Sequence, residues 1–357
     1  MADTPLLRGF QWLWSAKPPL PGAVWVVATC ESVQAARGFL EDLAARLTRP
    51  VAVLLLDEGP YQEPWPWALA PRFGPERVAL RLKPAGLVIL DDHPMARGIA
   101  HHGVCPVSWI NARSPDLLGL GRVLVDSEAQ ATAIGGGLVT GNPCLDWPAP
   151  LEPVDETFCG RFQSVRKAGR WLMYFAATVP GEETLAYATF LNISARSGGL
   201  LALAPADAAR HEEVYRESIK YHLLTTRQKR LMTSEVPPKT RVYYIEEESA
   251  RQAMYACADA IVMGGTFAEG PTDALIALSA GVSVVVGPRH HDPLVGAAVL
   301  ADAVIACDHE AALTVETARL MADPVLRASR AARLRDWVAL QPGARSRVVA
   351  LLAADFS

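Results

Sequence analysis

The segment from Ala260 to Pro288 constrains the fold more than any other, because it contains a complete strand–turn–helix–strand pattern. A short apolar run, Ala260–Met263, stops at a pair of glycines. Gly270 and Pro271 then mark a helix start with proline at the first helical position. A helical stretch leads to the β-branched run 282–286, which is typical of a buried strand. The pattern predicts one βαβ unit of a parallel sheet.

Such a βαβ unit binds its ligand beyond the carboxyl ends of the strands, where helix N-termini favour anions. The segment therefore predicts a site for a phosphate-bearing ligand. The alternative is a plain connection whose glycines only make a turn. The residues predicted to form the site are Gly264, Gly265, Thr266, Gly270, Thr272 and Asp273.

Strand and helix patterns alternate along both halves of the chain. Strands are predicted at Val24–Thr29, Val51–Leu56, Gly86–Leu90, Val104–Ile110, Trp171–Ala176, Leu200–Ala204 and Val242–Ile245. The segment 62–75, rich in proline and tryptophan, predicts an aromatic loop, and the proline-rich Leu145–Asp155 predicts an interdomain linker. We therefore expect an α/β fold with two doubly wound, Rossmann-like parallel-sheet domains facing across a cleft. Their predicted bounds are 1–150 and 151–335, followed by a helical tail over 336–357, and a chain of 357 residues suits two domains.

Charge and cysteine usage exclude several classes of function. The formal net charge of -4 argues against nucleic-acid binding as the main activity. Six cysteines are scattered without a CxxC pair, which indicates neither a zinc site nor a disulfide framework. Most of them sit in apolar runs, so we expect most to be buried thiols in a reducing, cytoplasmic compartment.

The N-terminal region contains an apolar stretch that bears on membrane attachment. Residues 1–17 lack the continuous apolar core of a signal peptide, and no segment has the length of a spanning helix. Leu6–Trp14 is nonetheless rich in apolar and tryptophan residues, a composition suited to a membrane interface. Packing of this stretch onto its own domain is the alternative.

Polar residues follow several predicted strands at the same edge of the sheet. Glu31 falls at a strand-to-helix turn, where it is either a general base or a first-turn residue favoured by the helix dipole. Arg113 follows another strand and suits a phosphate or carboxylate, with a surface salt bridge as the alternative. Asp92 lies between an acid and a histidine, but neighbouring side chains point apart, which argues against a metal site.

Six segments, in one order, resemble motifs of the Kdo transferases of lipopolysaccharide synthesis. They are Trp25–Ala36 (WVVATCESVQAA), Pro106–Ser114 (PVSWINARS), Val139–Asp146 (VTGNPCLD), Phe175–Glu183 (FAATVPGEE), Ala258–Thr266 (ADAIVMGGT) and Gly281–Pro288 (GVSVVVGP). Members of this family are two-domain glycosyltransferases of the GT-B type. They move 3-deoxy-D-manno-octulosonic acid (Kdo) from CMP-Kdo to a lipid A precursor.

The resemblance implies a mechanism and a location. Glu31 matches the family's catalytic glutamate and would accept the proton of an acceptor hydroxyl in one inverting displacement. The N-terminal domain would bind the acceptor and the C-terminal domain the nucleotide sugar, with the phosphate of CMP held by the amides of residues 264–266. Asp92, Arg113, Asn142 and Arg289 would contact substrates. No metal or further cofactor is expected, and the protein would sit at the cytoplasmic face of the bacterial inner membrane.

Departures from the family concentrate where the donor would bind. Ala206, Ala250 and Ile276 stand where the family has donor-contacting residues. Asp273 would compete with a phosphate, so a working donor site predicts that its carboxylate turns away or binds a sugar hydroxyl. The alternatives left open are a catalytically silent paralogue acting as a binding partner, and a GT-B enzyme or epimerase that uses another nucleotide sugar.

Overall fold

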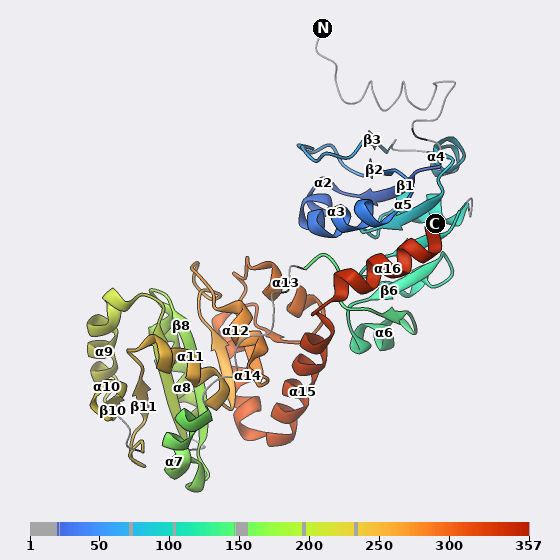
Figure 1. The fold of residues 1–357 in the computed structure, drawn as a ribbon. Helices are drawn as coiled ribbons and strands as arrows, with labels where there is room; N and C mark the ends of the chain where they lie inside the picture. The colour runs from blue at the N-terminus through green and yellow to red at the C-terminus, as the bar shows by residue number, and fades with distance from the viewer. Residues whose placement is uncertain are drawn as a thin grey trace. The chain divides into compact units, whose positions relative to one another are not determined.

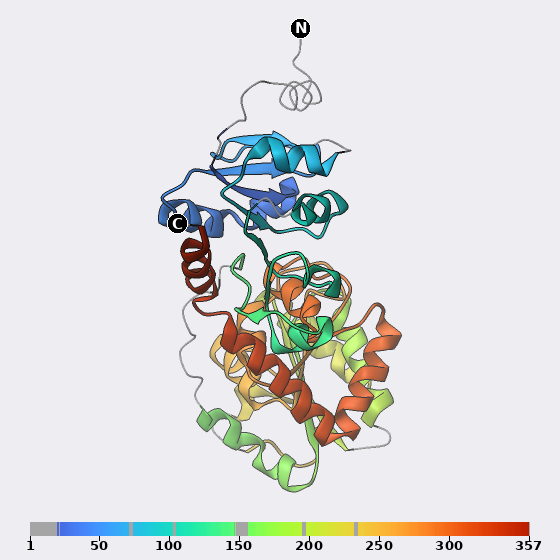
Figure 2. The ribbon, with the colours of Figure 1, turned by 90° about the vertical axis from the view of Figure 1, so that its right-hand side faces the viewer.

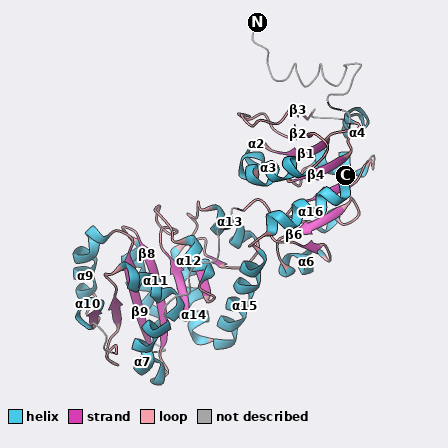
Figure 3. Cartoon of the chain, in the orientation of Figure 1, coloured by secondary structure: helices cyan, strands magenta, loops and turns pink. Residues whose placement is uncertain are grey.

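The computed structural model describes residues 20, 22–70, 74–102, 105–145, 147, 156–194, 198–231 and 235–356. The chain divides into two compact units (Figure 1). Unit 1 comprises Met1–Ala149 with Ala339–Ser357, and unit 2 comprises Pro150–Val338. In each unit the strands lie between layers of helices (Figure 3).

The described part of unit 1 contains a seven-stranded sheet in the order β3-β2-β1-β4-β5-β6-β7, with every pair parallel. Its strands are β1 Val24–Ala28, β2 Val51–Leu55, β3 Trp67–Leu69, β4 Gly86–Ile89, β5 Val107–Trp109, β6 Arg122–Val125 and β7 Leu138–Val139. Its helices are α2 Cys30–Ala35, α3 Arg37–Arg46, α4 Pro75–Leu82, α5 Pro94–His101, η1 Pro115–Leu117, α6 Glu128–Ile134 and α16 Ala344–Phe356.

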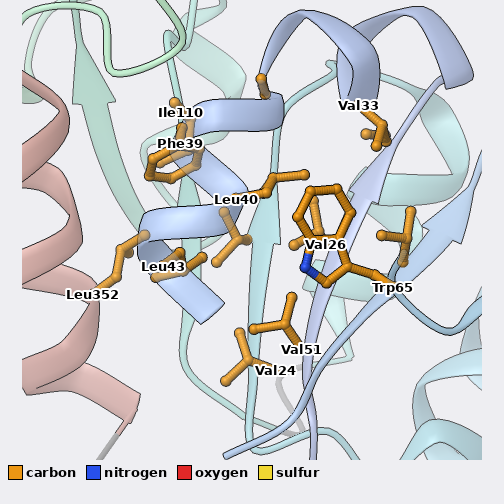
Figure 4. Packing of buried hydrophobic residues seen from close by; sticks show 14 of the residues in the cluster. Val24, Val26, Val33, Phe39, Leu40, Leu43, Val51, Trp65, Ile110 and Leu352 are labelled. Atoms are coloured by element: carbon orange, nitrogen blue, oxygen red, sulfur yellow. The ribbon is translucent and has the colours of Figure 1, made fainter. Parts of the chain in front are cut away.

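The central strands of unit 1 are buried on both faces, which is why β1 and β2 are continuous apolar runs. One apolar cluster packs Val26 and Trp65 against Phe39 and Leu40 of α3 and Leu352 of α16 (Figure 4). A second cluster covers the other face of the sheet. The two faces together give unit 1 its own hydrophobic core.

The last helix of the chain returns to unit 1 and lies beside α3 (Figures 1 and 2). Arg49 Nε donates to the carbonyl of Phe356 at 2.9 Å, and Arg122 pairs with Asp355 at 2.5 Å. Gly141 has φ +78°, and a Cβ there would meet the Leu340 carbonyl at 2.4 Å. The close passage of the chain at this point therefore requires glycine.

The described part of unit 2 contains a second seven-stranded parallel sheet, in the order β10-β11-β9-β8-β12-β13-β14. Its strands are β8 Trp171–Thr178, β9 Gly199–Pro205, β10 Thr225–Arg227, β11 Val242–Tyr244, β12 Ala260–Met263, β13 Ser283–Val286 and β14 Ile305–Ala306. Its helices are η2 Glu156–Phe162, α7 Gln163–Lys167, α8 Glu182–Ser194, η3 Ala208–Arg210, α9 His211–Lys220, α10 Gln228–Leu231, α11 Glu248–Cys257, α12 Ala274–Ser279, α13 Pro293–Leu300, α14 Glu310–Ala322 and α15 Pro324–Leu340.

The expected α/β fold with two doubly wound parallel sheets is confirmed by these two strand orders. Local corrections are needed. The segment 62–75 is not wholly a loop, because β3 pairs with β2 inside it. The helix after β12 begins at Ala274 and not at Pro271, and the helix after β1 is interrupted at Ala36.

The prediction of unpaired cysteines is wrong for one pair. Cys159 in η2 and Cys257 at the end of α11 form a disulfide with a Cα–Cα distance of 5.1 Å. Cys30, Cys105, Cys144 and Cys307 are free thiols. The argument for a reducing compartment therefore does not extend to the disulfide pair.

Two predicted segments fall mostly or wholly outside the described residues. Leu6–Trp14 lies outside them, as does most of the linker Leu145–Asp155. Among the described helices, none has both the length and the apolar character needed to cross a membrane.

Candidate active site

Glu31 lies in the first turn of α2, which follows β1 at the carboxyl edge of the first sheet. Thr29 precedes the helix as its N-cap, and its Oγ1 accepts the N–H of Ser32 at 3.2 Å. Glu31 is the second residue of α2, and its side chain is exposed. Within the described ranges no hydrogen bond or ion pair engages its carboxylate. It is therefore available to accept a proton from a ligand.

Two aspartates from the neighbouring strands fix this turn. Asp91, after β4, accepts the N–H of Thr29 and the hydroxyl of Ser32, both at 2.7 Å. Asp57, after β2, accepts the N–H of Cys30 at 2.7 Å. Because β2 and β4 flank β1, acids at their ends reach the helix start between them. Sequence reasoning missed both roles, although acids after adjacent strands were the available signal.

Cys30 lies beside Glu31 but does not compete with it as a reactive group. Its thiol is buried, and burial followed by the charge of Asp57 raises its pKa above the ordinary value. The thiol is therefore protonated at neutral pH, which makes it a weak nucleophile.

Three other residues predicted to contact substrates in unit 1 are engaged within the protein. Asp92 accepts from Arg97 Nε at 2.5 Å, and Arg113 pairs with the buried Asp126 at 2.8 Å. The Oδ1 of Asn142 accepts from Asn111 Nδ2 at 2.8 Å and from the Cys144 N–H at 2.9 Å. Arg113 thus forms a salt bridge, which was the alternative to its binding a phosphate or carboxylate. Substrate binding by these three residues would have to share or break internal bonds.

The glycine turn after β12 in unit 2 is built for close packing. Gly265 has φ +70°, and a Cβ there would meet the Pro271 carbonyl at 2.3 Å. Gly264 donates its N–H to the Ala176 carbonyl at 2.8 Å, and its own Cβ would meet Ala177 O at 2.3 Å. These two glycines are required by the turn itself.

A buried carboxylate fills the space where a phosphate was expected. Glu182, at the start of α8, is only 3% exposed. Its two oxygens accept the N–H groups of Val179 at 3.0 Å, Gly265 at 2.9 Å, Thr266 at 3.2 Å, Phe267 at 2.9 Å and Ala268 at 3.1 Å. The expectation that the amides of 264–266 hold a phosphate is therefore corrected, because these donors already have acceptors inside the protein.

Sequence reasoning missed Glu182 because a glutamate just after Pro180-Gly181 looks like an ordinary first-turn residue. The available signal was the pairing of a Gly-Glu-Glu helix start with a glycine turn. The second acid, Glu183, is also buried, and it forms an ion pair with Arg210 at 2.8 Å.

Asp273 turns away from the start of α12. Its carboxylate forms an ion pair with Arg251 and accepts from the hydroxyl of Tyr255 at 2.9 Å. Burial raises the pKa of Tyr255 well above its ordinary value, followed by the effects of Tyr174 and Asp273. The phenol therefore stays a neutral donor to Asp273. The carboxylate therefore makes no capping hydrogen bond to α12 and is engaged with Arg251 and Tyr255.

Arg289 supplies a cation at the carboxyl edge of the second sheet. Its backbone N–H donates to the Thr266 carbonyl at 2.8 Å, while its side chain is exposed and has no partner among the residues that the structure describes. Gly270 is exposed and Thr272 is half-buried on the adjoining loop. The described part of the chain holds no group of three or more histidine, cysteine, aspartate or glutamate side chains arranged for a metal ion.

No family model matches the chain, and no curated protein matches it. Solved structures with similar folds include the C-terminal CMP-Kdo binding domain of WaaA from Acinetobacter baumannii. That domain has 20% sequence identity and a TM-score of 0.47, over 51% of this chain and 96% of the domain. A mutant O-GlcNAc transferase from Thermobaculum terrenum has 14% identity and a TM-score of 0.39, over 98% of this chain and 73% of that one.

A UDP-forming α,α-trehalose-phosphate synthase from Burkholderia vietnamiensis is similar at 12% identity and a TM-score of 0.34, over 93% of this chain and all of that one.

Proposed function

We propose that this protein is a glycosyltransferase of the GT-B type that uses a nucleotide sugar, with Glu31 as its general base. The observation that carries the proposal is the free, exposed carboxylate of Glu31 on a turn that Asp57 and Asp91 hold in place. A base needs a free carboxylate at a fixed position, whereas Asp57, Asp91 and Asp92, which follow β2 and β4, have internal partners.

In the proposed reaction, Glu31 accepts the proton of an acceptor hydroxyl while the hydroxyl oxygen attacks the anomeric carbon of the donor sugar. The new carbon–oxygen bond forms as the bond to the nucleotide phosphate breaks, and the configuration at that carbon inverts. The leaving nucleotide takes the bonding electrons and gains negative charge. A cation near the leaving group stabilises that charge.

We further propose that the donor is CMP-Kdo and the acceptor a lipid A precursor, reached at the inner-membrane surface. This finer assignment rests on the six motifs that resemble the Kdo transferases. The acceptor would bind to unit 1 and the donor to the carboxyl edge of the sheet in unit 2. There Arg289 would meet the phosphate or the sugar carboxylate, and Gly270 and Thr272 would line the donor site.

The test is incubation of the full chain with CMP-Kdo and a lipid A precursor, with detection of product by mass spectrometry. Since general bases contribute about 10²–10⁴ in rate, Glu31→Gln should lower turnover by at least about 100-fold without a change in melting temperature. Glu128→Gln is the matched control, because Glu128 is also an exposed glutamate in the first turn of a helix that follows a strand of the same sheet.

The possible outcomes test the reaction type, the donor and the general base separately. Product from a UDP- or GDP-sugar but not from CMP-Kdo would retain the transferase and replace the donor. Equal loss of turnover in Glu31→Gln and Glu128→Gln, or none in either, would remove Glu31 as the base.

A catalytically silent binding protein is the second candidate, favoured by one specific observation. The amides of the glycine turn are bonded to Glu182, and Ala206, Ala250 and Ile276 replace the family's donor-contacting residues. Calorimetry with CMP and CMP-Kdo distinguishes the two, because a silent scaffold of this kind should bind neither.

A further inference from the structure

Successive backbone amides after β12 converge on one carboxylate inside unit 2. Glu182 accepts the N–H groups of residues 265–268 at 2.9 to 3.2 Å, together with that of Val179. A run of consecutive amides that point to one place forms an anion-binding concavity. Because Glu182 is almost fully buried, the anion in this concavity belongs to the chain and not to a ligand.

The same turn is hydrogen-bonded to the next loop at the sheet edge, which follows β13. Thr266 Oγ1 accepts the N–H of Gly287 at 2.9 Å, and the Thr266 carbonyl accepts the N–H of Arg289 at 2.8 Å. Both bonds fix the backbone that follows β13. A continuous set of hydrogen bonds therefore runs from Glu182 through Thr266 to the backbone of Arg289, whose side chain is exposed.

We propose that Glu182 is a positioning residue of the donor site: it is a built-in anion that holds the turn 264–273 and thereby places Arg289. It acts through the turn and touches no substrate. The identity of the ligand in this proposal rests on the proposed function, whereas the requirement for an anion is measurable without any ligand.

The chemistry of the concavity makes the requirement specific. An ionised carboxylate only accepts hydrogen bonds, so both of its oxygens suit a ring of N–H donors. Glutamine would turn one side of the group into a donor that faces other donors, and aspartate would withdraw the oxygens by one methylene. Alanine would leave a cavity of unpaired N–H groups that a small carboxylate such as formate can enter.

The experiment compares thermal unfolding of the full chain in sodium formate and in sodium chloride at equal ionic strength. Glu182→Ala should melt about 5–10 °C lower than wild type, and formate should recover several degrees more than chloride does. Phe190→Ala is the control, since it removes a buried side chain of the same helix without opening an anion site. Wild type and Phe190→Ala should respond alike to the two salts.

The consequence for ligand binding is measured with CMP by calorimetry. Glu182→Ala should bind CMP about tenfold more weakly than wild type, which corresponds to about 1.4 kcal/mol, and formate should restore much of the affinity. Failure of the wild type to bind CMP would count against the proposed donor, while the melting experiment would still decide the role of Glu182 in the turn.

A second measurement decides the matter if Glu182→Ala does not fold. In wild type, hydrogen exchange at the amides of 265–268 should be as slow as in β12. In Glu182→Asp it should be faster by about tenfold or more. Fast exchange at these amides in wild type, or an alanine variant that melts like wild type with no preference for formate, would overturn the proposal.

Discussion

The carboxyl edges of the two sheets use internal carboxylates in different ways. In unit 1, Asp57 and Asp91 come from neighbouring strand ends, hold the turn between them and leave Glu31 exposed. In unit 2, Glu182 comes from a helix, is buried, and takes up the amides of the turn itself. In unit 1 the carboxylate of Glu31 is therefore exposed to solvent, whereas in unit 2 the carboxylate of Glu182 is enclosed by the protein.

This difference teaches that a glycine turn between a strand and a helix predicts an anion but not its source. The same backbone geometry serves a bound phosphate or an internal carboxylate. At such an edge, a residue open to a ligand is one with a free side chain, as Glu31 has in unit 1 and Arg289 in unit 2.

The largest expected effect on stability comes from adding a side chain at Gly265 in the glycine turn of unit 2. Gly265→Ala combines a left-handed backbone with a Cβ that would approach Pro271 O to 2.3 Å, so we expect a loss of at least about 3 kcal/mol. Gly135→Ala is the matched control in unit 1, because Gly135 has φ +79° with no atom within 4 Å of its Cβ, and it should cost about 1–2 kcal/mol. Chemical denaturation measures both. Equal losses would mean that the close approach in unit 2 adds nothing.

A smaller effect, on ligand affinity, is expected when the exposed cation of Arg289 is removed. Arg289→Ala should weaken donor binding about tenfold, since one charge-assisted contact is worth about 1.5–3 kcal/mol when fully formed and less at an exposed site. The melting temperature should stay unchanged because the side chain has no internal partner among the described residues. Lys220→Ala is the control. It removes an exposed charge at the C-terminal end of α9 and should leave the affinity for the donor unchanged. Calorimetry with CMP-Kdo compares the two, and equal affinities would place the donor elsewhere.

The smallest effect concerns a histidine near the edge of the second sheet. Burial lowers the pKa of His211, and its Nδ1 lies 3.1 Å from Tyr244 Oη. The folded state then binds protons less readily than the unfolded chain. The contribution of the neutral ring is therefore present above a pH of about 6.5 and is lost as the pH falls towards the lower folded pKa.

His211→Gln should flatten the fall in stability below that pH, and His291→Gln, at an exposed histidine, should not. Denaturation at a series of pH values gives the two slopes. A wild-type slope in His211→Gln would show that other groups govern the acid limb.

The sequence predicted the regular parts of the fold because buried parallel strands are uninterrupted apolar runs. It failed where the pattern was short or polar. The strand β3 has only three residues next to a proline, and β10 reads Thr-Thr-Arg, which lacks the apolar run that predicts a buried strand. The Cys159–Cys257 pair spans 98 residues and depends on tertiary packing that spacing alone does not show.

The positions of the candidate site residues relative to the strands were predictable from the sequence, but their interaction partners were not. Placing Glu31 after β1 needed only the strand and the helix that follow one another. Deciding that Arg113 and Asp273 are paired, or that Glu182 occupies the turn, needed the distances between residues far apart in the chain.

The return of α16 to unit 1 means that the chain passes between the two units twice. A fragment ending near residue 149 would lack Val348, Leu352 and Phe356 and would expose the apolar face of α3 that they cover. An autonomous version of unit 1 therefore has to include residues 339–357 as well as residues 1–149. Truncation of the last helix should therefore destabilise unit 1 and make it prone to aggregation.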